Sequence, residues 1–413
     1  MAAIRRTPAR WAPRGPPPPR STAPPGHGSA SLRRLLRAQT PAYPHTARHL
    51  HTDPHTEPGG HPTPYGRPRG RRRGRPRARR RHGGHRPRRV GFPRRRFGAP
   101  SAAARTQQVE YFTPQGHPRH TTVPVATPKS LLSAHRARSA AELAADGTVT
   151  SVVRNGPTDK KVDVVVIGDG YTLAQQKDFH ADAKAKWAQI SAVEPYASNR
   201  SLFNVWTVDA VSNQSGVSGD PAKGVVKDTA LDARFWCDDI ERLLCVDTGK
   251  VESYASKAPD ADLVLVLGNS AKYGGAGYNG ITSSVGYDGI ATASSDHRDS
   301  AQVAVHETGH SLGKLADEYV YDTNGTYSGP EPDAPNITRM SVAEMKAKKA
   351  KWYRYLGQNS PDGGKVGAFE GGGYYPRGLN RPTENSIMRT LGREFNLPGR
   401  QAMIDGFHRH TGR

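Results

Sequence analysis

The spacing of hydrophobic residues predicts a mixed α/β sheet in the middle of the chain. Residues 162–167 and 261–270 are apolar at nearly every position, which is typical of strands buried on both faces. Residues 200–211 predict a further strand, and residues 174–193 show the spacing of an amphipathic helix. The order strand, helix, strand, helix, strand indicates a twisted sheet that contains parallel strands.

Segments on either side of this region have weaker patterns. Residues 109–125 and 147–161 alternate apolar and polar positions, as edge strands do, and residues 130–147 between them predict a helix or a linker. Residues 106–158 are therefore expected to form a small N-terminal strand and helix segment. A helix is predicted over 296–312, followed by a loop-rich part that contains one short helix at 341–352.

Charge is distributed very unevenly along the 413 residues. The first 100 residues contain 25 arginines, no lysine, two acidic residues and 19 of the 34 prolines, whereas the remainder has 35 basic and 35 acidic residues. Because such a segment cannot bury enough apolar surface to offset its chain entropy, we expect residues 1–105 to be a disordered basic tail.

Three interpretations of this tail stay open. Its arginines between residues 67 and 96 could bind nucleic acid or acidic surfaces non-specifically, through charge alone. The tail could also be solvated and have no specific partner. Finally, arginine without lysine, together with much proline, glycine and histidine, is what GC-rich DNA upstream of the true start would encode.

Export of the protein is expected, although no signal sequence is visible. No apolar run of 18 residues exists, so no membrane-spanning segment is predicted. No apolar leader follows Met1 either, and a miscalled start would explain why it is missing. Cys237 and Cys245 are too far apart for a CxxC pair, and a local disulfide in a secreted protein is favoured over two buried thiols.

The stretch "VAVHETGHSLGKLADEYVY", residues 303–321, carries the candidate chemistry. On a helix, His306 and His310 project from one face, one turn apart, and can reach one zinc ion. Glu307 is then placed to take a proton from zinc-bound water. The alternative is three polar residues on a solvated helix, but the flanking residues are apolar, and buried histidines need partners.

A catalytic zinc site usually has a third protein ligand. Gly313 can end the helix and turn the chain back, which makes Asp317 the leading candidate. Glu318 and the more distant Glu370 are alternatives for this position. Asp317 could instead cap the helix or orient a histidine ligand.

Two further features accompany this stretch. Ser-Ile-Met, ending at Met388, is similar to the methionine turn beneath the zinc of metzincin peptidases. Tyr374 or Tyr375 could donate a hydrogen bond to the oxyanion, although both rings could equally pack or line the cleft. The segment "YGGAG", residues 273–277, could form a cleft edge with which an extended substrate pairs.

These motifs together resemble the IgA-peptidase family of zinc metallopeptidases, within the metzincin-like group. The resemblance runs from about residue 162 to 397 and rests on "VVVIGDGYT", "EPYASNRSLFNVW", "SGVSGD", "NSAKYGGAGY", "HETGHSLGKLADEY", "FEGGGYY" and "RPTENSIMR". It implies a secreted endopeptidase with one Zn²⁺ per chain, His306 and His310 as ligands, Glu307 as the base and Met388 in the methionine turn. Ala316, however, stands where the wider metzincin pattern has its third ligand.

The predicted function is hydrolysis of peptide bonds in a protein or peptide substrate by a zincin-like catalytic domain over residues 159–413. Three other classes are open: a catalytically silent zinc-containing binding protein, a protein with a structural zinc, and a nucleic-acid binder that acts through the tail. Nothing in the sequence selects immunoglobulin as the substrate.

Overall fold

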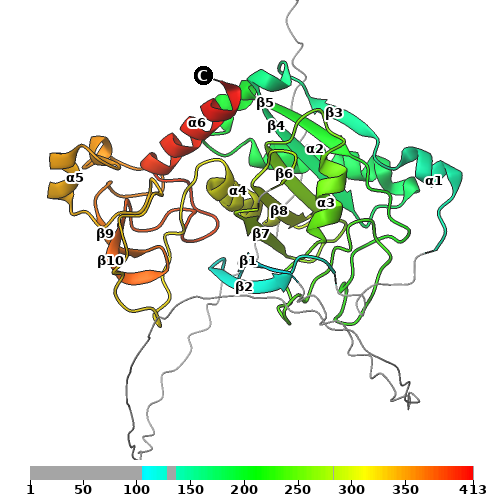
Figure 1. Cartoon of the computed structure of the whole chain (residues 1–413), viewed down its shortest axis with the longest axis horizontal. Helices are drawn as coiled ribbons and strands as arrows, with labels where there is room; N and C mark the ends of the chain where they lie inside the picture. Colours follow the sequence, from blue (N-terminus) through cyan, green and yellow to red (C-terminus); the bar gives the residue numbers. More distant parts are fainter. Residues whose placement is uncertain (1–104, 128–135, 282, 413) are drawn as a thin grey trace, which may run out of the picture. The chain divides into compact units, whose positions relative to one another are not determined.

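The computed structural model describes residues 105–127, 136–281 and 283–412, and they form a mixed α/β arrangement (Figure 1). The expectation of a disordered, nucleic-acid-binding tail therefore concerns residues that lie almost wholly outside the described part. No helix within the described ranges is long and apolar enough to cross a membrane.

One large sheet organises the structure. Its strands are β1 (Thr106–Phe112), β2 (Pro118–Pro124), β3 (Val149–Val153), β4 (Val162–Asp169), β5 (Phe203–Val208), β6 (Leu263–Gly268), β7 (Gly275–Asn279) and β8 (Gly289–Ser294). Their order across the sheet is β2-β1-β7-β8-β6-β4-β5-β3. The four strands β8, β6, β4 and β5 are parallel, and the strands on either side pair antiparallel. The patterns that indicated edge strands correspond to the two ends of the sheet, and the segment 106–158 contributes three strands to it.

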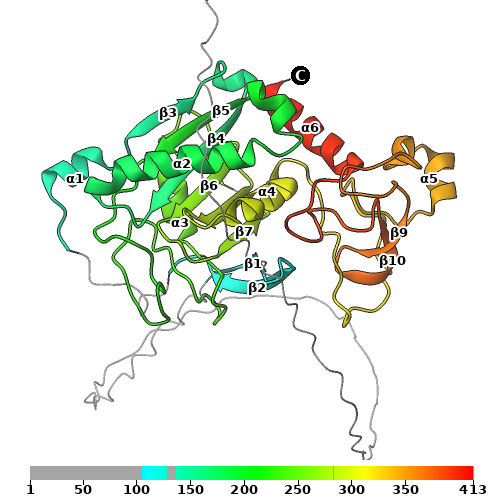
Figure 2. The same cartoon turned by 180° about the vertical axis from the view of Figure 1, so that it is seen from behind.

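Helices cover both faces of the sheet. The described helices are α1 (Ala140–Ala145), α2 (Gln176–Ile190), α3 (Thr248–Ala255), α4 (Ser300–Ser311), α5 (Val342–Lys348) and α6 (Leu397–Thr411), with short 3-10 helices at Thr158–Lys160, Leu173–Gln175, Ala197–Leu202 and Tyr353–Tyr355, and α5 lies away from the sheet, near β9 and β10. Figures 1 and 2 show α2 and α4 on one face and α3 on the other. This layering explains why the central strands are buried on both faces and mostly apolar.

The alternation along β4 shows how the two layers form. Val164 and Val166 pack into one core with α2, α4 and α6, whereas Val165 and Ile167 pack into the core beneath α3. All four side chains are buried, because successive residues of a strand point to opposite faces. The strand β6 lies between β4 and β8, in agreement with the prediction that residues 261–270 contain a strand buried on both faces.

The C-terminal third contains more regular structure than its loop-like sequence predicts. Strands β9 (Phe369–Gly372) and β10 (Tyr375–Arg381) form a separate two-stranded sheet. Helix α6 begins at the cap residue Asn396, whose side chain accepts the N–H of Gly399, and it has Pro398 in its first turn. Glycine-rich strands and a helix with few apolar residues give a weak hydrophobic pattern.

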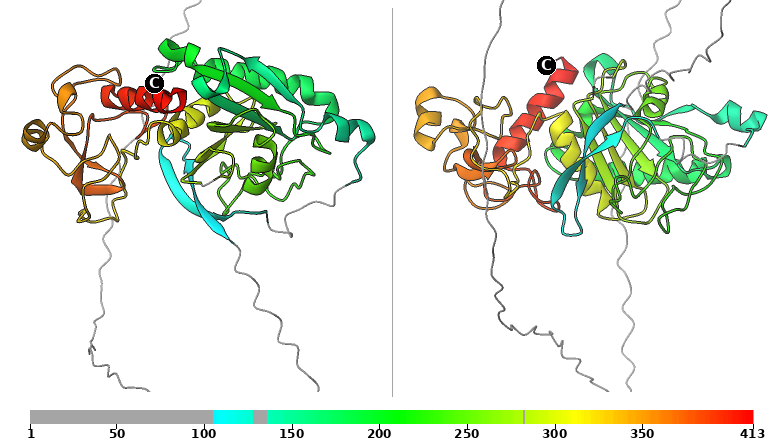
Figure 3. Two further views of the ribbon diagram at one scale, coloured as in Figure 1. Left: turned by 45° about the horizontal axis from the view of Figure 1, so that its top comes forward. Right: turned by 60° about the horizontal axis from the view of Figure 1, so that its bottom comes forward.

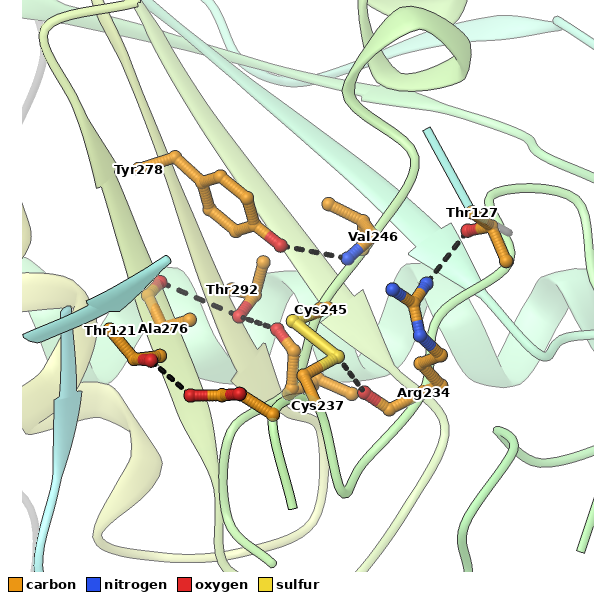
Figure 4. The surroundings of a disulfide bond; sticks show 11 residues. Thr121, Thr127, Arg234, Cys237, Cys245, Val246, Ala276, Tyr278 and Thr292 are labelled. Carbon is orange, nitrogen blue, oxygen red and sulfur yellow. Dashed lines mark hydrogen bonds between the residues drawn. A yellow bond between two sulfur atoms is a disulfide. The ribbon is translucent and has the colours of Figure 1, made fainter. Parts of the chain in front are cut away.

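A loop below the sheet carries the disulfide between Cys237 and Cys245, whose Cα atoms are 6.2 Å apart (Figure 4). This loop contacts the hairpin made by β1 and β2. Thr121 on β2 donates to Asp238, and Arg234 donates to Thr127 over 2.7 Å. The loop therefore supports the hairpin from the face opposite α4.

We predict that α6 contributes strongly to stability. The ring of Phe407 lies 4.9 Å from that of Phe203 and 5.3 Å from that of Tyr196. Phe407→Ala should lower the free energy of unfolding by about 3–5 kcal/mol, measured by urea denaturation, because it opens a cavity in the core. Leu143→Ala, at a position that is 60% exposed, should change it by less than about 0.5 kcal/mol. Equal effects of the two substitutions would contradict this packing.

Candidate metal centre

Helix α4 places two histidines on one buried face. It packs against β7 and β8, and His306 is fully buried while the His310 side chain keeps 11% exposure. Buried imidazoles require hydrogen-bond partners on both ring nitrogens, or a metal on one of them. The contacts of these rings therefore reveal what the site can bind.

Each histidine uses its Nδ1 atom in the same way. His306 Nδ1 donates to the carbonyl of Ile387 over 2.9 Å, and His310 Nδ1 donates to the carbonyl of Leu315 over 2.7 Å. A carbonyl only accepts, so the proton of each neutral ring is on Nδ1 and the lone pair is on Nε2. The two Nε2 atoms face each other at 3.1 Å.

Two carboxylates meet these lone pairs. Asp317 Oδ1 lies 3.3 Å from His306 Nε2 and 3.5 Å from His310 Nε2. Glu110, which β1 supplies, places Oε1 3.4 Å from His306 Nε2 and Oε2 3.2 Å from His310 Nε2. One ligand atom from each of the four residues lies within 4.8 Å of the other three.

The four residues fit a bound cation. Asp317 Oδ1 is buried and has no hydrogen-bond partner among the described residues. With both ring protons on Nδ1, the four converging atoms are all acceptors, and only positive charge between them relieves their repulsion. Burial opposes protonation of His306, but the negative charge of Glu110 and the adjacent carboxylate of Asp317, which can accept the added proton, raise its pKa to about 10. The electric field at this point thus favours a cation.

Asp317 is oriented by an aromatic neighbour. Tyr374 donates its hydroxyl to Asp317 Oδ2 over 2.6 Å, so that Oδ1 is directed at the histidines. Tyr374 has a φ of 73°, an uncommon conformation that the preceding glycines and its backbone bond to Tyr319 support. The adjacent Tyr375 points elsewhere, with its ring 5.1 Å from that of Tyr327.

The other two candidates for the third ligand have different surroundings. Glu318 is fully buried, but its oxygens accept hydrogen bonds from Asn336, Ser386 and Asn396. Glu370 is exposed on β9. Of the three acids, Asp317 alone contributes an atom to the cluster found within the described residues.

The turn after α4 differs in detail from the predicted one. Helix α4 ends at Ser311, and Lys314 takes the left-handed conformation, with a φ of 52°. Gly313 does not have the left-handed conformation. A glycine is needed there for steric reasons, because a Cβ would lie 2.7 Å from the carbonyl oxygen of Gly309. The chain nevertheless turns back at this point and brings Asp317 to the histidines.

Met388 lies beneath the helix. A Cβ at Gly309 would come within 2.6 Å of Met388 Sδ, so the glycine between the two histidines allows this close packing. The neighbouring Ile387 supplies the carbonyl that orients His306. The segment 386–388 therefore supports the histidines from below, at the place where the sequence indicates a methionine turn.

Glu307 lies beside the cluster and faces β7. Its Oε2 accepts the side-chain N–H of Asn279 over 2.9 Å, while Oε1 is buried without a hydrogen-bond partner in the described structure. A Cβ at Gly277 would stand 1.7 Å from Oε2, so only glycine fits there. Burial, together with the charge of Glu110, raises the pKa of Glu307 to about 8.

The sequence reasoning missed several residues around this site. Glu110 had no motif to reveal it, and Asn279 follows the predicted cleft edge without forming part of it. His120, on β2, hydrogen-bonds through Nδ1 to the hydroxyls of Tyr319 and Tyr321 over 2.9 and 3.3 Å. Tyr319 also borders a cavity of about 800 Å³ that is lined by both acidic and basic side chains.

The fold and the site together define an α/β protein with a candidate metal centre on a central helix. A family model described as IgA Peptidase M64 matches residues 150–362 and 356–407, more than half of the chain. The chain belongs to this peptidase family, as its motifs indicated, and a protein or peptide substrate follows from that membership. A search of curated proteins gave no match. Strands β1 and β2, and with them Glu110, precede the matched region.

We predict that Asp317 contributes strongly to metal affinity. Asp317→Ala should weaken zinc binding by more than about 100-fold, because even residues that only orient ligands contribute 10–100-fold. Competition with a chromophoric chelator measures this affinity. Glu370→Gln, an exposed acid on β9, is the matched control and should bind zinc as the unsubstituted protein does. An unchanged affinity in Asp317→Ala would exclude Asp317 as a ligand.

Metal loading should also raise thermal stability. Zinc at about 100 times its Kd should stabilise the folded state by about 2.7 kcal/mol, because the cluster is assembled only on folding. The measurement is the Tm with zinc and with a chelator in excess. Asp317→Ala should show a smaller shift, and identical Tm values under the two conditions would argue against a metal site.

Proposed function

We propose that this protein is a zinc-dependent endopeptidase with a zincin-like, metzincin-type catalytic domain. The observation that carries the proposal is the convergence of His306, His310 and Asp317 beside the buried carboxylate of Glu307. Membership of a peptidase family supports hydrolysis of peptide bonds as the reaction. The position of Met388 beneath α4 supports the relation to metzincins.

The donor set favours zinc. Two imidazole nitrogens and a carboxylate oxygen are ligands typical of a catalytic zinc site, whereas sites for magnesium or calcium use oxygen alone. When bound there, zinc would supply a Lewis acid that polarises the scissile carbonyl and lowers the pKa of water towards ~7. His306, His310 and Asp317 would hold it, each oriented by a hydrogen bond of its own.

Glu307 is the proposed general base. Asn279 fixes one of its oxygens over 2.9 Å and leaves Oε1 free to accept a proton from water. The same carboxyl group then delivers this proton to the leaving amine. A pKa raised to about 8 suits this exchange, because a base is most effective when its pKa is close to the working pH.

Other residues complete the proposed site. Tyr374 positions Asp317, and its predicted role as an oxyanion donor stays a prediction, as does that of Tyr375. An extended substrate could pair with β7, whose Gly277 lies against Glu307. We also propose an extracellular location, which a disulfide between Cys237 and Cys245 fits.

One observation favours a second candidate, a zinc-containing binding protein without turnover. Glu110 brings the number of candidate ligands to four, and four ligands are typical of a closed, structural site. The position of Glu307 favours catalysis. A structural zinc site does not require a second buried glutamate, and within the described residues Glu307 Oε1 has no hydrogen-bond partner. Activity measurements decide between the two.

We predict that Glu307→Gln keeps one zinc per chain and loses about 10²–10⁴-fold in turnover, because the amide cannot take up a proton. Zinc content and the hydrolysis of labelled casein measure the two properties on the same preparation. Glu370→Gln should leave both unchanged. Activity close to that of the unsubstituted protein would remove Glu307 as the base, and loss of zinc would assign it to the ligands.

A further inference from the structure

We infer that the hairpin of β1 and β2 keeps the metal centre in a latent state. Glu110 takes the coordination position that a catalytic site leaves open, and β1 occupies the edge of β7 on which a substrate strand would lie. This inference rests on the proposed zinc peptidase, but the two can be tested separately.

The first support is the position of the Glu110 carboxylate. It approaches His310 Nε2 to 3.2 Å and His306 Nε2 to 3.4 Å, and its side chain has no exposed surface. A hydrolytic zinc site needs a position for water or for the scissile carbonyl beside its three protein ligands. The Glu110 carboxylate, which comes from another segment of the chain, would fill that position when zinc is bound.

The second support is the strand that carries Glu110. Strand β1 pairs antiparallel with β7, and Glu110 is the residue opposite Gly277. Gly277 in turn lies directly against the carboxylate of Glu307. A peptide that adds to the edge of β7 would place its backbone along the same line. The hairpin and an extended substrate therefore compete for one edge.

Side chains of the hairpin also cover the histidines and the tyrosines next to them. His120 on β2 bonds to Tyr319 and Tyr321, and the ring of Phe112 lies 5.0 Å from that of His306. His306 has no exposed side-chain surface, and Asp317 has only 1%. Figure 3 shows the hairpin along the edge of the sheet, beside α4. With the hairpin in this place, His306 is covered completely and His310 keeps only 11% of its side-chain surface exposed.

The third support is that the hairpin is peripheral to the sheet. Strands β7, β8, β6, β4, β5 and β3 pair with one another without it, and β7 becomes the edge once β1 leaves. The region that matches the peptidase family begins at residue 150, after the hairpin. The matched region therefore does not include Glu110.

The test uses the full-length, zinc-loaded protein with Glu110→Ala and Glu110→Gln. Gln108→Ala, an exposed position on the same strand, is the matched control. Acetohydroxamate, a small zinc-binding probe, is titrated by calorimetry, and zinc content and casein hydrolysis are measured in parallel. Both Glu110 variants should retain zinc and bind the probe at least about tenfold more tightly. They should also cleave casein at least about tenfold faster, because the hairpin loses its ion pairs with both histidines and leaves the edge of β7 more readily. Gln108→Ala should match the unsubstituted protein.

Glu110→Gln preserves the shape of the side chain, so the test does not depend on the alanine variant being folded. Loss of zinc in the glutamine variant, or probe binding equal to that of the control, would overturn the inference, because Glu110 would then be a permanent ligand or no obstacle. Tighter probe binding without casein cleavage in any variant would support the closed centre and count against the peptidase proposal alone.

Discussion

The arrangement of this site depends on where two imidazole rings keep their protons. The carbonyls of Ile387 and Leu315 each accept a hydrogen bond from Nδ1, and this fixes both Nε2 lone pairs toward the same point. Two carboxylates converge there as well, and within the described structure Asp317 Oδ1 is buried without a hydrogen-bond partner. The turn after α4, the segment 386–388 and Tyr374 all orient members of this cluster. A cation bound between them would couple the stability of these three parts of the chain.

The number of carboxylates that would bind a metal here determines whether a reacting group can also bind it. Three protein ligands leave room for a reacting group, whereas a fourth excludes it. The second glutamate, Glu307, is held apart from the cluster by Asn279 and by the absence of a side chain at Gly277. In the latent state that we infer, the same scaffold would change from a closed to an open centre when strand β1, which carries Glu110, leaves the edge of the sheet.

Local sequence patterns predicted the candidate site residues that lie on helix α4 and in the turn after it. His306, Glu307 and His310 are related by helical periodicity, and Asp317 follows within a short turn, although Lys314 rather than Gly313 has the left-handed conformation. The edge strands and the central strands also followed from alternation and from continuous apolar runs. Glu110 could not be found in this way, because it reaches the histidines by strand pairing across the sheet edge. Helix α6 and the β9–β10 hairpin were missed because their residues are only partly apolar and rich in glycine.

The sequence distances within the site have a consequence for how the molecule is made. Glu110 and His310 are 200 residues apart, His306 and Ile387 are 81 apart, and Asp317 and Tyr374 are 57 apart. Contacts of such long range form late in folding, because large loops must close first. A chain that emerges N-terminus first has already produced the hairpin before the histidines, and the histidines before the segment that orients them. Each new molecule therefore completes this site only after the segment 386–388 has been made, when Glu110 is already present.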